Sequence, residues 1–358
     1  MRMAGSLIRA GWAVLMSLLL ATSSCAGESQ RAAPPDTGAA GATSPRLAAG
    51  CDRFASPRGH DHWRGSRRHP FRTVKRLARS LRSGRTGCLA PGGYRHRGVA
   101  KLRRPGVTLR SLRRRRARVD GTIWITGRAR GARLSRIRLT THDRTFTIPL
   151  KVQADGVRVT GNSITTSTSA NCILVGSRRR TASGVVIERN RIQRCGRTGK
   201  YDHLIYVSHA IGTVVRGNLL LDNRGGWAVH LYPDADSSLI EHNVIDHNLG
   251  GVVFAGNGPE GISDRNEVRN NAITASGPRW NIEASWSGGP DGVANVAHSN
   301  CLYSARQANG GIAPDTGFSV RANTIVTRPP YVGGGDYGFR ANSACEALVG
   351  RVPGILLR

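Results

Sequence analysis

Two neighbouring stretches of the sequence combine histidine, tyrosine and acidic side chains with an apolar run. They are YDHLIYVSH (201–209) and WAVHLYPDAD (227–236). Imidazole can accept or donate a proton near neutral pH, a tyrosine hydroxyl can donate one, and a carboxylate can serve as an acid, a base or a cation ligand. The two stretches therefore predict either a site for acid–base chemistry or a site for a polar ligand.

The facing of these side chains follows from aligning five short apolar runs as strands. The runs are NCILV (171–175), HLIYV (203–207), AVHLY (228–232), GVVFA (251–255) and NIEAS (281–285). Because side chains alternate between the two faces of a strand, the apolar second and fourth positions are expected in the core. This alignment predicts Tyr206 in the core and places His203, His230, Tyr232, Asn281 and Glu283 on one solvent-facing sheet.

We divide the candidate site residues by role. The catalytic candidates are His203, His230, Tyr232 and Glu283, and the substrate-binding candidates are His209, Asp234, Asp236, Asn281 and Trp286. The alignment puts His230 and Glu283 two coils apart, about 9–10 Å from the spacing of paired strands, and puts His209 level with Asp234. Asp234 and Asp236 have a second interpretation as turn residues that accept hydrogen bonds from nearby N–H groups.

Two reactions and one binding role fit such a groove. Uronate elimination needs a base, for which His203 or His230 is the candidate, and a proton donor, for which Tyr232 is the candidate. The substrate carboxylate would be neutralised by arginine or by Ca²⁺ held by Asp234, Asp236 or Glu283, although no calcium-loop spacing is present. A hydrolase would instead use two carboxyl groups. The alternative is a non-catalytic protein that binds envelope or acidic polysaccharide in the same groove.

An internal repeat positions these strands. Seven segments, among them GVVIERNRI (184–192) and GTVVRGNLL (212–220), each place an asparagine two residues before an aliphatic side chain. The asparagines are Asn162, Asn190, Asn218, Asn243, Asn271, Asn300 and Asn323. A period of this length, built from β-rich runs, predicts an all-β, right-handed parallel β-helix, a single-stranded solenoid of about nine or ten coils. The asparagines are expected to stack as a hydrogen-bonded ladder, with Ile137 in the equivalent position one coil upstream.

The ends of the chain carry the signals of caps, an export segment and disulfides. We expect an N-terminal cap over 51–100 with a capping helix over 69–84, the β-helix over 101–330, and a C-terminal cap over 331–358 that closes the last coil. Residues 1–25 read as a signal peptide and 26–50 as a flexible linker. Cys25 is predicted to be lipidated, with ordinary cleavage after Ala26 as the alternative. Proximity along the chain pairs Cys51 with Cys88, Cys172 with Cys195, and Cys301 with Cys345.

A family resemblance agrees with this organisation. HPFRTVKRLARSLRSGRTGCLAPGGYR, PGVTLRS, DHLIYV, HLYPDA and the asparagine repeat together resemble the secreted right-handed parallel β-helix repeat proteins common in actinobacteria, within the pectate lyase-like superfamily. The resemblance implies the fold from about Cys51 onward. It leaves the activity open, because lyases, hydrolases, epimerases and phage adhesins all occur in the superfamily. No complete pectate lyase or polygalacturonase active-site motif is present to carry over.

The charge and the composition of the chain indicate which class of partner it binds. The formal charge of +31 suggests nucleic acid, but only four of the 53 basic residues are lysine, a bias typical of a GC-rich genome, and the chain carries an export signal. We therefore expect an acidic or neutral polysaccharide as the partner of a secreted, lipid-tethered monomer, with a purely compositional surface charge as the alternative. The cysteines show no metal-binding spacing, and no motif supports a nucleotide, haem or nicotinamide cofactor.

Overall fold

The computed structural model describes residues 50–145, 147–168, 170–195, 201–274, 276–314 and 316–350. The predicted signal peptide, Cys25, the predicted linker up to residue 49 and residues 351–358 lie outside the described residues. Within this part of the chain, no helix is both long enough and apolar enough to cross a membrane.

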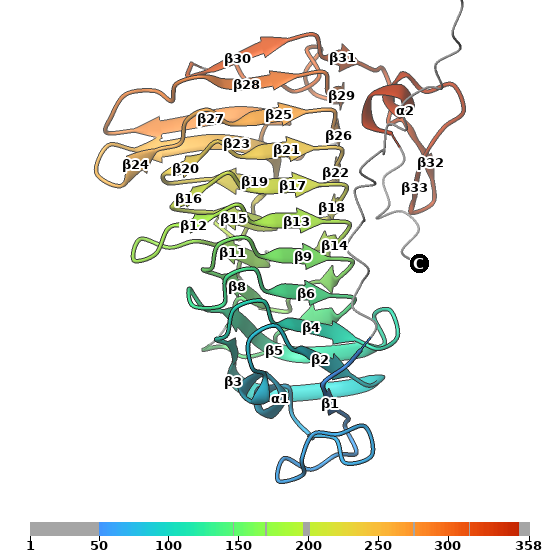
Figure 1. The fold of residues 1–358 in the computed structure, drawn as a ribbon. Coiled ribbons are helices and arrows are strands. Elements are labelled where there is room, and N and C mark those ends of the chain that lie inside the picture. Colours follow the sequence, from blue (N-terminus) through green and yellow to red (C-terminus); the bar gives the residue numbers. More distant parts are fainter. Residues whose placement is uncertain are drawn as a thin grey trace, which may run out of the picture. The chain divides into compact units, whose positions relative to one another are not determined.

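Stacked short strands form the first side of a parallel solenoid (Figure 1). Eleven strands pair side by side along it. They are β1 (Arg53–Ala55), β2 (Thr86–Leu89), β4 (Thr108–Ser111), β6 (Arg133–Ser135), β9 (Arg158–Thr160), β13 (Val186–Glu188), β17 (Val214–Arg216), β21 (Leu239–Glu241), β25 (Glu267–Arg269), β28 (Asn295–His298) and β30 (Phe318–Arg321).

The other two sides share one sheet of 17 strands. The second side contains β7 (Arg138–Thr140), β10 (Ser163–Ile164), β14 (Arg191–Gln193), β18 (Leu219–Leu221), β22 (Val244–Asp246), β26 (Ala272–Thr274), β29 (Cys301–Tyr303) and β31 (Thr324–Ile325). The third side contains β8 (Leu150–Val152), β11 (Ile173–Val175), β15 (Ile205–Val207), β19 (Trp227–Leu231), β23 (Gly250–Asn257) and β27 (Ile282–Ser287). The long strands β3 (Gly92–Leu102) and β5 (Ala117–Ile125) join them, since β5 pairs with both β7 and β8.

Smaller elements decorate the coils. β12 (Ala182–Ser183), β16 (Ala210–Ile211) and β20 (Ala235–Asp236) form a three-stranded sheet. β24 (Gly261–Ile262) turns back antiparallel on β23, and β32 (Tyr331–Gly333) pairs antiparallel with β33 (Asp336–Phe339). The core consists of inward aliphatic side chains from successive coils, such as the fully buried Ile187, Val215 and Ile240. The predicted all-β parallel solenoid is confirmed.

The asparagine ladder forms as predicted from Asn162 to Asn323. In a typical rung, Asn190 Nδ2 donates to Asn218 Oδ1 at 3.0 Å and to the Val159 carbonyl oxygen at 2.9 Å. The backbone N–H of Asn190 donates to the same Asn218 Oδ1 at 2.9 Å. Ile137 begins the ladder, because its backbone N–H donates to Asn162 Oδ1 at 3.0 Å. Each rung thus satisfies the buried backbone groups that the turn frees from strand pairing.

Two further pairs of asparagines, outside the ladder, were not predicted. Asn223 and Asn248 are linked by a backbone N–H to side-chain bond of 3.0 Å, and Asn266 Nδ2 donates to Asn295 Oδ1 at 2.9 Å. Neither pair recurs along the whole chain, so no periodic signal reveals them.

The N-terminal helix is shorter than predicted. α1 spans Val74–Ser80 rather than 69–84, and Thr73 caps it by accepting from the Arg76 backbone N–H at 3.1 Å. Phe71 lies before the helix, where it bridges in parallel to Ala55, and Leu81 is already extended. The apolar residues whose helical spacing predicts the helix are nevertheless all buried, because the flanking segments direct their side chains into the same core; they are Phe71, Val74, Leu77, Ala78 and Leu81.

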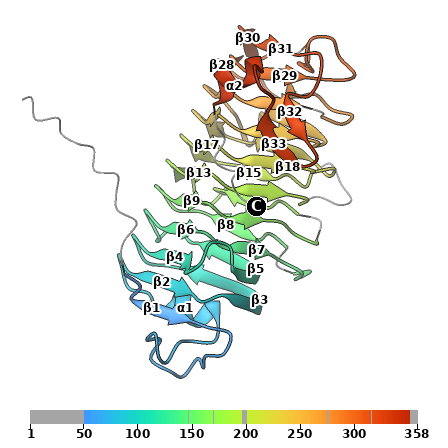
Figure 2. The same ribbon diagram turned by 90° about the vertical axis from the view of Figure 1, so that its right-hand side faces the viewer.

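The C-terminal segment covers the flank of the solenoid, so the expectation that it closes the last coil is wrong. α2 (Ala344–Val349) and the β32–β33 hairpin lie beside the second side of the solenoid (Figures 1 and 2). Tyr331, Cys345 and Val349 pack against outward apolar side chains of β18, β22 and β26, namely Leu219, Leu221, Val244 and Ala272. These outward leucines and valines need a cover, and the C-terminal segment supplies it.

All three predicted disulfides are present in the structure. Cys51–Cys88 ties β1 to β2, Cys172–Cys195 closes one coil, and Cys301–Cys345 fastens α2 to β29. Disulfides persist in oxidising compartments, so the three bonds agree with the predicted export.

The ladder gives a prediction about stability. Replacing Asn218 by alanine removes its side-chain bonds to Asn243 and Ile187 and leaves the buried backbone N–H of Asn190 without a partner. We expect the free energy of unfolding to fall by about 2–3 kcal/mol, since each buried group left unpaired costs about 1–3 kcal/mol.

Urea unfolding followed by circular dichroism measures this loss. Asn323→Ala is the matched control, because Asn323 is only half-buried at the end of the ladder and should cost less. Equal losses for the two variants would contradict a cooperative ladder.

Candidate functional site

The outward side chains of the third side form one continuous row along the solenoid axis, which we call the outward row. The paired residues of successive strands in this row are Lys101, Trp124, Lys151, Leu174, Tyr206, His230, Val253 and Glu283. Parallel strands lie about 4.8 Å apart, so Tyr206 and His230 are direct neighbours. His230 and Glu283 are two coils apart, as predicted.

Tyr206 does not face the core, and that prediction was wrong by one residue of register. Tyr206 pairs with His230, while Ile205 pairs with Val229. Leu204 and Ile205 are both fully buried, so strict alternation fails at the start of this strand. The apolar pattern then fits two registers, and a shift of one residue turns every following side chain to the other face.

The two predicted histidines form a direct pair. His230 Nδ1 lies 2.7 Å from His203 Nε2, and their ring centroids are 4.3 Å apart. His203 is only 2% exposed, whereas His230 is half-buried at the edge of the pair. The rings of Tyr206 and Trp227 lie 5.3–5.5 Å from those of the histidines, and Tyr232 stacks on His230 at 5.4 Å. We call these five residues the ring cluster.

The hydrogen bonds fix where the protons of the neutral pair lie. The backbone N–H of Trp227 donates to His203 Nδ1 at 3.3 Å, so this nitrogen carries no proton. His203 Nε2 therefore carries the proton and donates it to His230 Nδ1. The remaining nitrogen of His230, Nε2, must then be an N–H group that points away from His203.

Burial keeps both imidazoles neutral. Desolvation lowers the pKa of His230 to about 3. Desolvation, and then the neighbouring His230, lowers the pKa of His203 well below its usual range. In its resting form the pair thus offers one neutral N–H donor, at His230 Nε2, to a ligand on the outward face.

Glu283 joins the cluster through two donors. Its carboxylate accepts from the Trp227 indole N–H and from Arg279, whose Nε lies 3.3 Å from Glu283 Oε1. The Glu283 side chain is 1% exposed, while the Arg279 side chain is 45% exposed and its guanidinium lies over the Trp227 ring at 5.2 Å. Glu283 therefore does not reach solvent. From beneath the surface, its carboxylate orients the side chains of Trp227 and Arg279.

Two glycines make room for the cluster. A Cβ atom at Gly226 would lie 2.7 Å from His203 Nδ1, and one at Gly250 would lie 2.4 Å from the Trp227 ring. Such distances are below any normal contact, so only glycine lets these loops approach the two rings. Sequence reasoning did not identify Gly226, Gly250, Trp227 or Arg279. Gly226, Trp227 and Arg279 each lie within four residues of a predicted site position, and Gly250 lies directly before the aligned run 251–255.

Tyr232 and the neighbouring loop form the other edge of the cluster. The Asn257 side-chain amide donates to the Tyr232 hydroxyl, which leaves the hydroxyl hydrogen of Tyr232 available to another acceptor. Asn257 also caps the loop by accepting from the Glu260 backbone N–H at 2.8 Å. Burial, followed by the neighbouring Tyr232 and Glu260, raises the pKa of Tyr206, so the Tyr206 hydroxyl stays protonated.

The acidic candidates lie on the β16–β20 side and play different parts. His209 and Asp234 are level on adjacent coils, as predicted, because Ala210 pairs with Ala235. Burial, and then the nearby Asp236, raises the pKa of Asp234. Asp236 accepts from the Asp264 backbone N–H at 2.9 Å and pairs with Arg265 at 2.7 Å. These bonds support the turn interpretation of Asp236.

Asn281 is buried, so its predicted place on the solvent-facing sheet is wrong, whereas Trp286 is partly buried and its predicted role in substrate binding stays a prediction. Asn281 is 1% exposed, and its amide donates to the carbonyl oxygens of Ile273, Tyr303 and Gly310 at 2.7–3.1 Å. Trp286 packs partly on the core cluster and donates from Nε1 to the Thr316 carbonyl oxygen at 3.0 Å. Both side chains hold loops together in the last coils.

A groove of about 960 Å³ runs along the loops that follow β10, β14, β18, β22 and β26. Its lining includes Ser167, Arg194, Arg224 and His247. These loops lead into the strands of the third side, where Arg224 is three residues before Trp227 and the groove residue Pro278 precedes Arg279. His247 Nδ1 lies 2.6 Å from the buried Asp246 carboxylate, so its Nε2 is the ring nitrogen left to face the groove.

The site holds no preformed metal cage. Among the described residues, no three His, Cys, Asp or Glu side chains gather as metal ligands. Two of the acidic candidates for Ca²⁺ already pair with arginines: Asp236 is paired with Arg265 and Glu283 with Arg279.

Comparison with known proteins identifies the fold family. A family model described as the right handed beta helix region matches residues 147–325, half of the chain. Among solved structures, pectate lyase Pel9A is similar at 10% identity and a TM-score of 0.57, with 79% of this chain and 84% of that chain covered. XylC, in its complex with xylose, is similar at 10% identity and a TM-score of 0.56, with 76% and 69% covered. No curated protein matches the chain.

The neutral histidine pair predicts a pH dependence of stability. The pKa values of His203 and His230 are lowered in the folded protein, so the unfolded chain binds more protons between about pH 6.5 and about pH 3. The free energy of unfolding should therefore fall as the pH drops through this window, by up to about 1.4 kcal/mol per pH unit for each histidine. Above about pH 6.5 this contribution is fully present.

Urea unfolding at several pH values between 7 and 4 tests this dependence. The double variant His203→Asn/His230→Asn should lose stability less steeply with falling pH than the wild type. Tyr206→Phe, which changes a neighbour without a group that titrates in this range, should keep the wild-type slope. Parallel curves for the double variant and the wild type would show that the pair is not held neutral.

Proposed function

The chain belongs to the right-handed β-helix family, and on this premise we propose that it binds and cleaves a polysaccharide on the outward face of β15, β19 and β23. One observation carries the proposal: His203, His230, Tyr206, Trp227 and Tyr232 converge within ring distances of 4.3–6.4 Å. Convergence of an imidazole, a hydroxyl and a charged pair around one point is what a reaction needs, whereas a binding surface needs only a groove.

Binding follows from the mixed character of the cluster. The rings of Tyr232 and His230 offer apolar faces to the planes of sugar rings, and their polar edges offer donors to hydroxyl or carboxylate groups. The half-exposed Arg279 adds a fixed positive group beside them. An extended chain would lie along the stacked coils, since both the outward row and the groove run in that direction.

Cleavage by β-elimination fits these residues better than hydrolysis does. In elimination, a base removes the C5 proton of a uronate, a double bond forms between C4 and C5, and the glycosidic oxygen on C4 leaves and is protonated. Arg279 would neutralise the uronate carboxylate, and Tyr232 would protonate the leaving oxygen. Hydrolysis would need two accessible carboxyl groups, but Glu283 is 1% exposed and Asp236 is paired with Arg265.

His230 is the proposed base, and His203 and Glu283 are positioning residues. To accept a proton, His230 Nε2 must first lose its own, which happens when the neutral pair exchanges tautomers. The exchange gives up the hydrogen bond from the Trp227 backbone to His203. Its cost of about 1–3 kcal/mol is small beside the barrier of the chemical step.

Non-catalytic binding of the same polymer is the second candidate function. Its support is the protonated His230 Nε2, which in the resting pair is a hydrogen-bond donor and not a base. A surface protein that holds envelope polysaccharide would use the ring cluster in this form. Export, a lipid anchor at Cys25 and a monomeric state belong to both candidate functions, and we propose them on the sequence signals alone.

A substrate screen of the purified protein separates these functions. Pectin, alginate, glycosaminoglycans and neutral glycans would be followed by the absorbance of unsaturated uronates and by reducing ends. We expect a gain in absorbance with at least one acidic polymer. Reducing ends without absorbance would contradict elimination, and retained binding without either signal would leave the non-catalytic function.

The His230→Gln variant assigns the activity to the ring cluster. Loss of a positioned base should lower kcat/KM by about 100-fold or more. His142→Gln, a change of an exposed histidine paired with Asp120, should leave the activity unchanged. Full activity of His230→Gln with the wild-type fold would reject the assignment.

A further inference from the structure

The positive charge of the chain is concentrated in one quarter of its length. Residues 51–130 contain 24 Lys and Arg against three Asp and no Glu, whereas residues 131–358 contain 25 Lys and Arg against 17 Asp and Glu. An arginine excess that only reflected genome composition would be spread evenly along the chain. The imbalance therefore belongs to the N-terminal coils and to α1.

Two adjoining hollows collect part of this charge. The first, of about 460 Å³, lies between α1 and β3 and is lined by Lys75, Arg79 and Arg104 together with Lys101, Arg103 and Arg128. The second, of about 490 Å³, shares Lys101, Arg103 and Arg128 and continues to Trp124, Gln153 and Arg180. Since they share three side chains, the hollows form one continuous depression, which we call the basic cleft.

Six of the seven cations that line the basic cleft are not neutralised by the protein, Arg180 being the exception. Among the described residues, Lys75, Arg79, Lys101, Arg103, Arg104 and Arg128 form no ion pair with a carboxylate. Asp155, which lies beside the cleft residue Arg180, already pairs with Arg130 and Arg180. Six like charges around one hollow repel one another, and a bound anion would relieve this repulsion.

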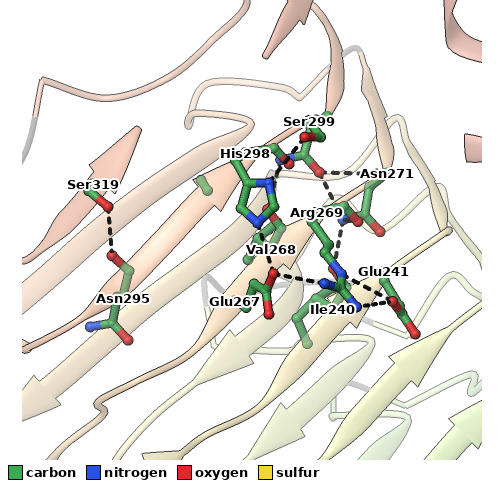
Figure 3. A network of polar contacts seen from close by, with 12 residues as sticks. Ile240, Glu241, Glu267, Val268, Arg269, Asn271, Asn295, His298, Ser299 and Ser319 are labelled. Atoms are coloured by element: carbon green, nitrogen blue, oxygen red, sulfur yellow. Dashed lines mark hydrogen bonds and ion pairs between the residues drawn. The ribbon is translucent and has the colours of Figure 1, made fainter. Parts of the chain in front are cut away.

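Several arginines of the later coils are instead paired with carboxylates. On the first side of the solenoid, Arg269 lies between Glu241 and Glu267 at 3.1 Å from each, and His298 approaches the same Glu267 at 2.8 Å (Figure 3). Arg216 likewise pairs with Glu188 at 2.9 Å. Where a coil carries paired charges the surface is close to neutral, so the unpaired cleft stands out as a local feature.

The shape and lining of the cleft favour a flexible anionic chain over a membrane surface or single-stranded nucleic acid. The cleft is concave, which suits a chain of anionic groups better than the flat surface of a membrane. Single-stranded nucleic acid would require free aromatic faces for its bases. The ring of Trp124, the aromatic side chain among the cleft residues, has Lys101 Nζ over it at 4.8 Å, and its Nε1 donates to Gln153 at 2.8 Å.

The cleft and the ring cluster lie on the same line. Lys101 and Trp124 are the first members of the outward row that continues through Lys151 and Leu174 to Tyr206. Four steps of about 4.8 Å separate Lys101 from Tyr206, or about 19 Å along the solenoid. One extended polymer can therefore contact both places.

From these observations we propose that the basic cleft binds an acidic polysaccharide and holds the part of the chain that extends beyond the ring cluster. The inference rests on the proposed function for its polymer and names the class, a glycan with repeated carboxylate or sulfate groups. Binding at the cleft itself requires no reaction at the ring cluster.

The test compares one backbone with and without its charges. Full-length protein is titrated with polygalacturonate and with the same polymer after complete methyl esterification, which removes the carboxylates. We expect polygalacturonate to bind at least tenfold more tightly, with an affinity that falls as salt rises because each contact releases counterions. Equal affinities for the two polymers would overturn the proposal.

A triple variant assigns that affinity to the cleft. Lys101→Gln/Arg103→Gln/Arg128→Gln should weaken polygalacturonate binding at least tenfold and flatten its salt dependence. The matched control, Arg306→Gln/Arg321→Gln/Arg328→Gln, removes the same charge from exposed arginines in the last coils and should stay within twofold of the wild type. Equal losses in both variants would mean that net charge alone binds the polymer.

Two further binding measurements distinguish acidic polysaccharide from other polyanions and distinguish binding at the cleft from the proposed reaction. Single-stranded DNA or anionic phosphatidylserine vesicles binding more tightly than polygalacturonate would overturn the choice of polymer. His230→Gln should weaken polygalacturonate binding less than the triple variant does, and this order of affinities would support the cleft as a separate contact even if no cleavage is found. A loss of binding in His230→Gln equal to that of the triple variant would overturn it.

Discussion

The register between stacked coils is the constraint on which the other features of this protein depend. Each ladder asparagine binds the backbone and the side chain of its neighbour, as Asn190 does with Asn218, so that adjacent coils cannot slide past one another. Because strand side chains alternate, this register also decides which residues reach the surface. Lys101, Tyr206, His230 and Glu283 share one row only because every coil between them is held in step.

Burial gives the outward row its chemistry. A histidine on an open sheet would titrate near neutral pH, but the packing of five aromatic and imidazole rings buries His203 and partly buries His230. Glu283 lies beneath the surface, where Trp227 and Arg279 both donate hydrogen bonds to it. The result is a neutral pair beside a positive guanidinium, with a strongly basic cleft further along the same face.

The fold was predictable from sequence because it repeats. The period of the asparagines, the spacing of the cysteines and the apolar helical pattern near Val74 each recur or act locally, and each was confirmed in outline. The site was predictable only in part. Adjacent buried residues such as Leu204 and Ile205 left the register of one strand ambiguous, and this reversed the facing of Tyr206. The cover of outward apolar residues by the C-terminal segment depends on contacts far apart in sequence, for which the repeat carries no signal.

The central claim is that the ring cluster and the basic cleft are two contacts for one chain, held about 19 Å apart by the register of the coils. The most direct measurement is the dissociation constant of the full-length protein for oligogalacturonates of increasing length, determined by calorimetry. The account predicts weak binding of short oligomers and a steep gain in affinity once the oligomer can span both contacts. Affinity that rises evenly with the number of charges, with no step at that length, would contradict it.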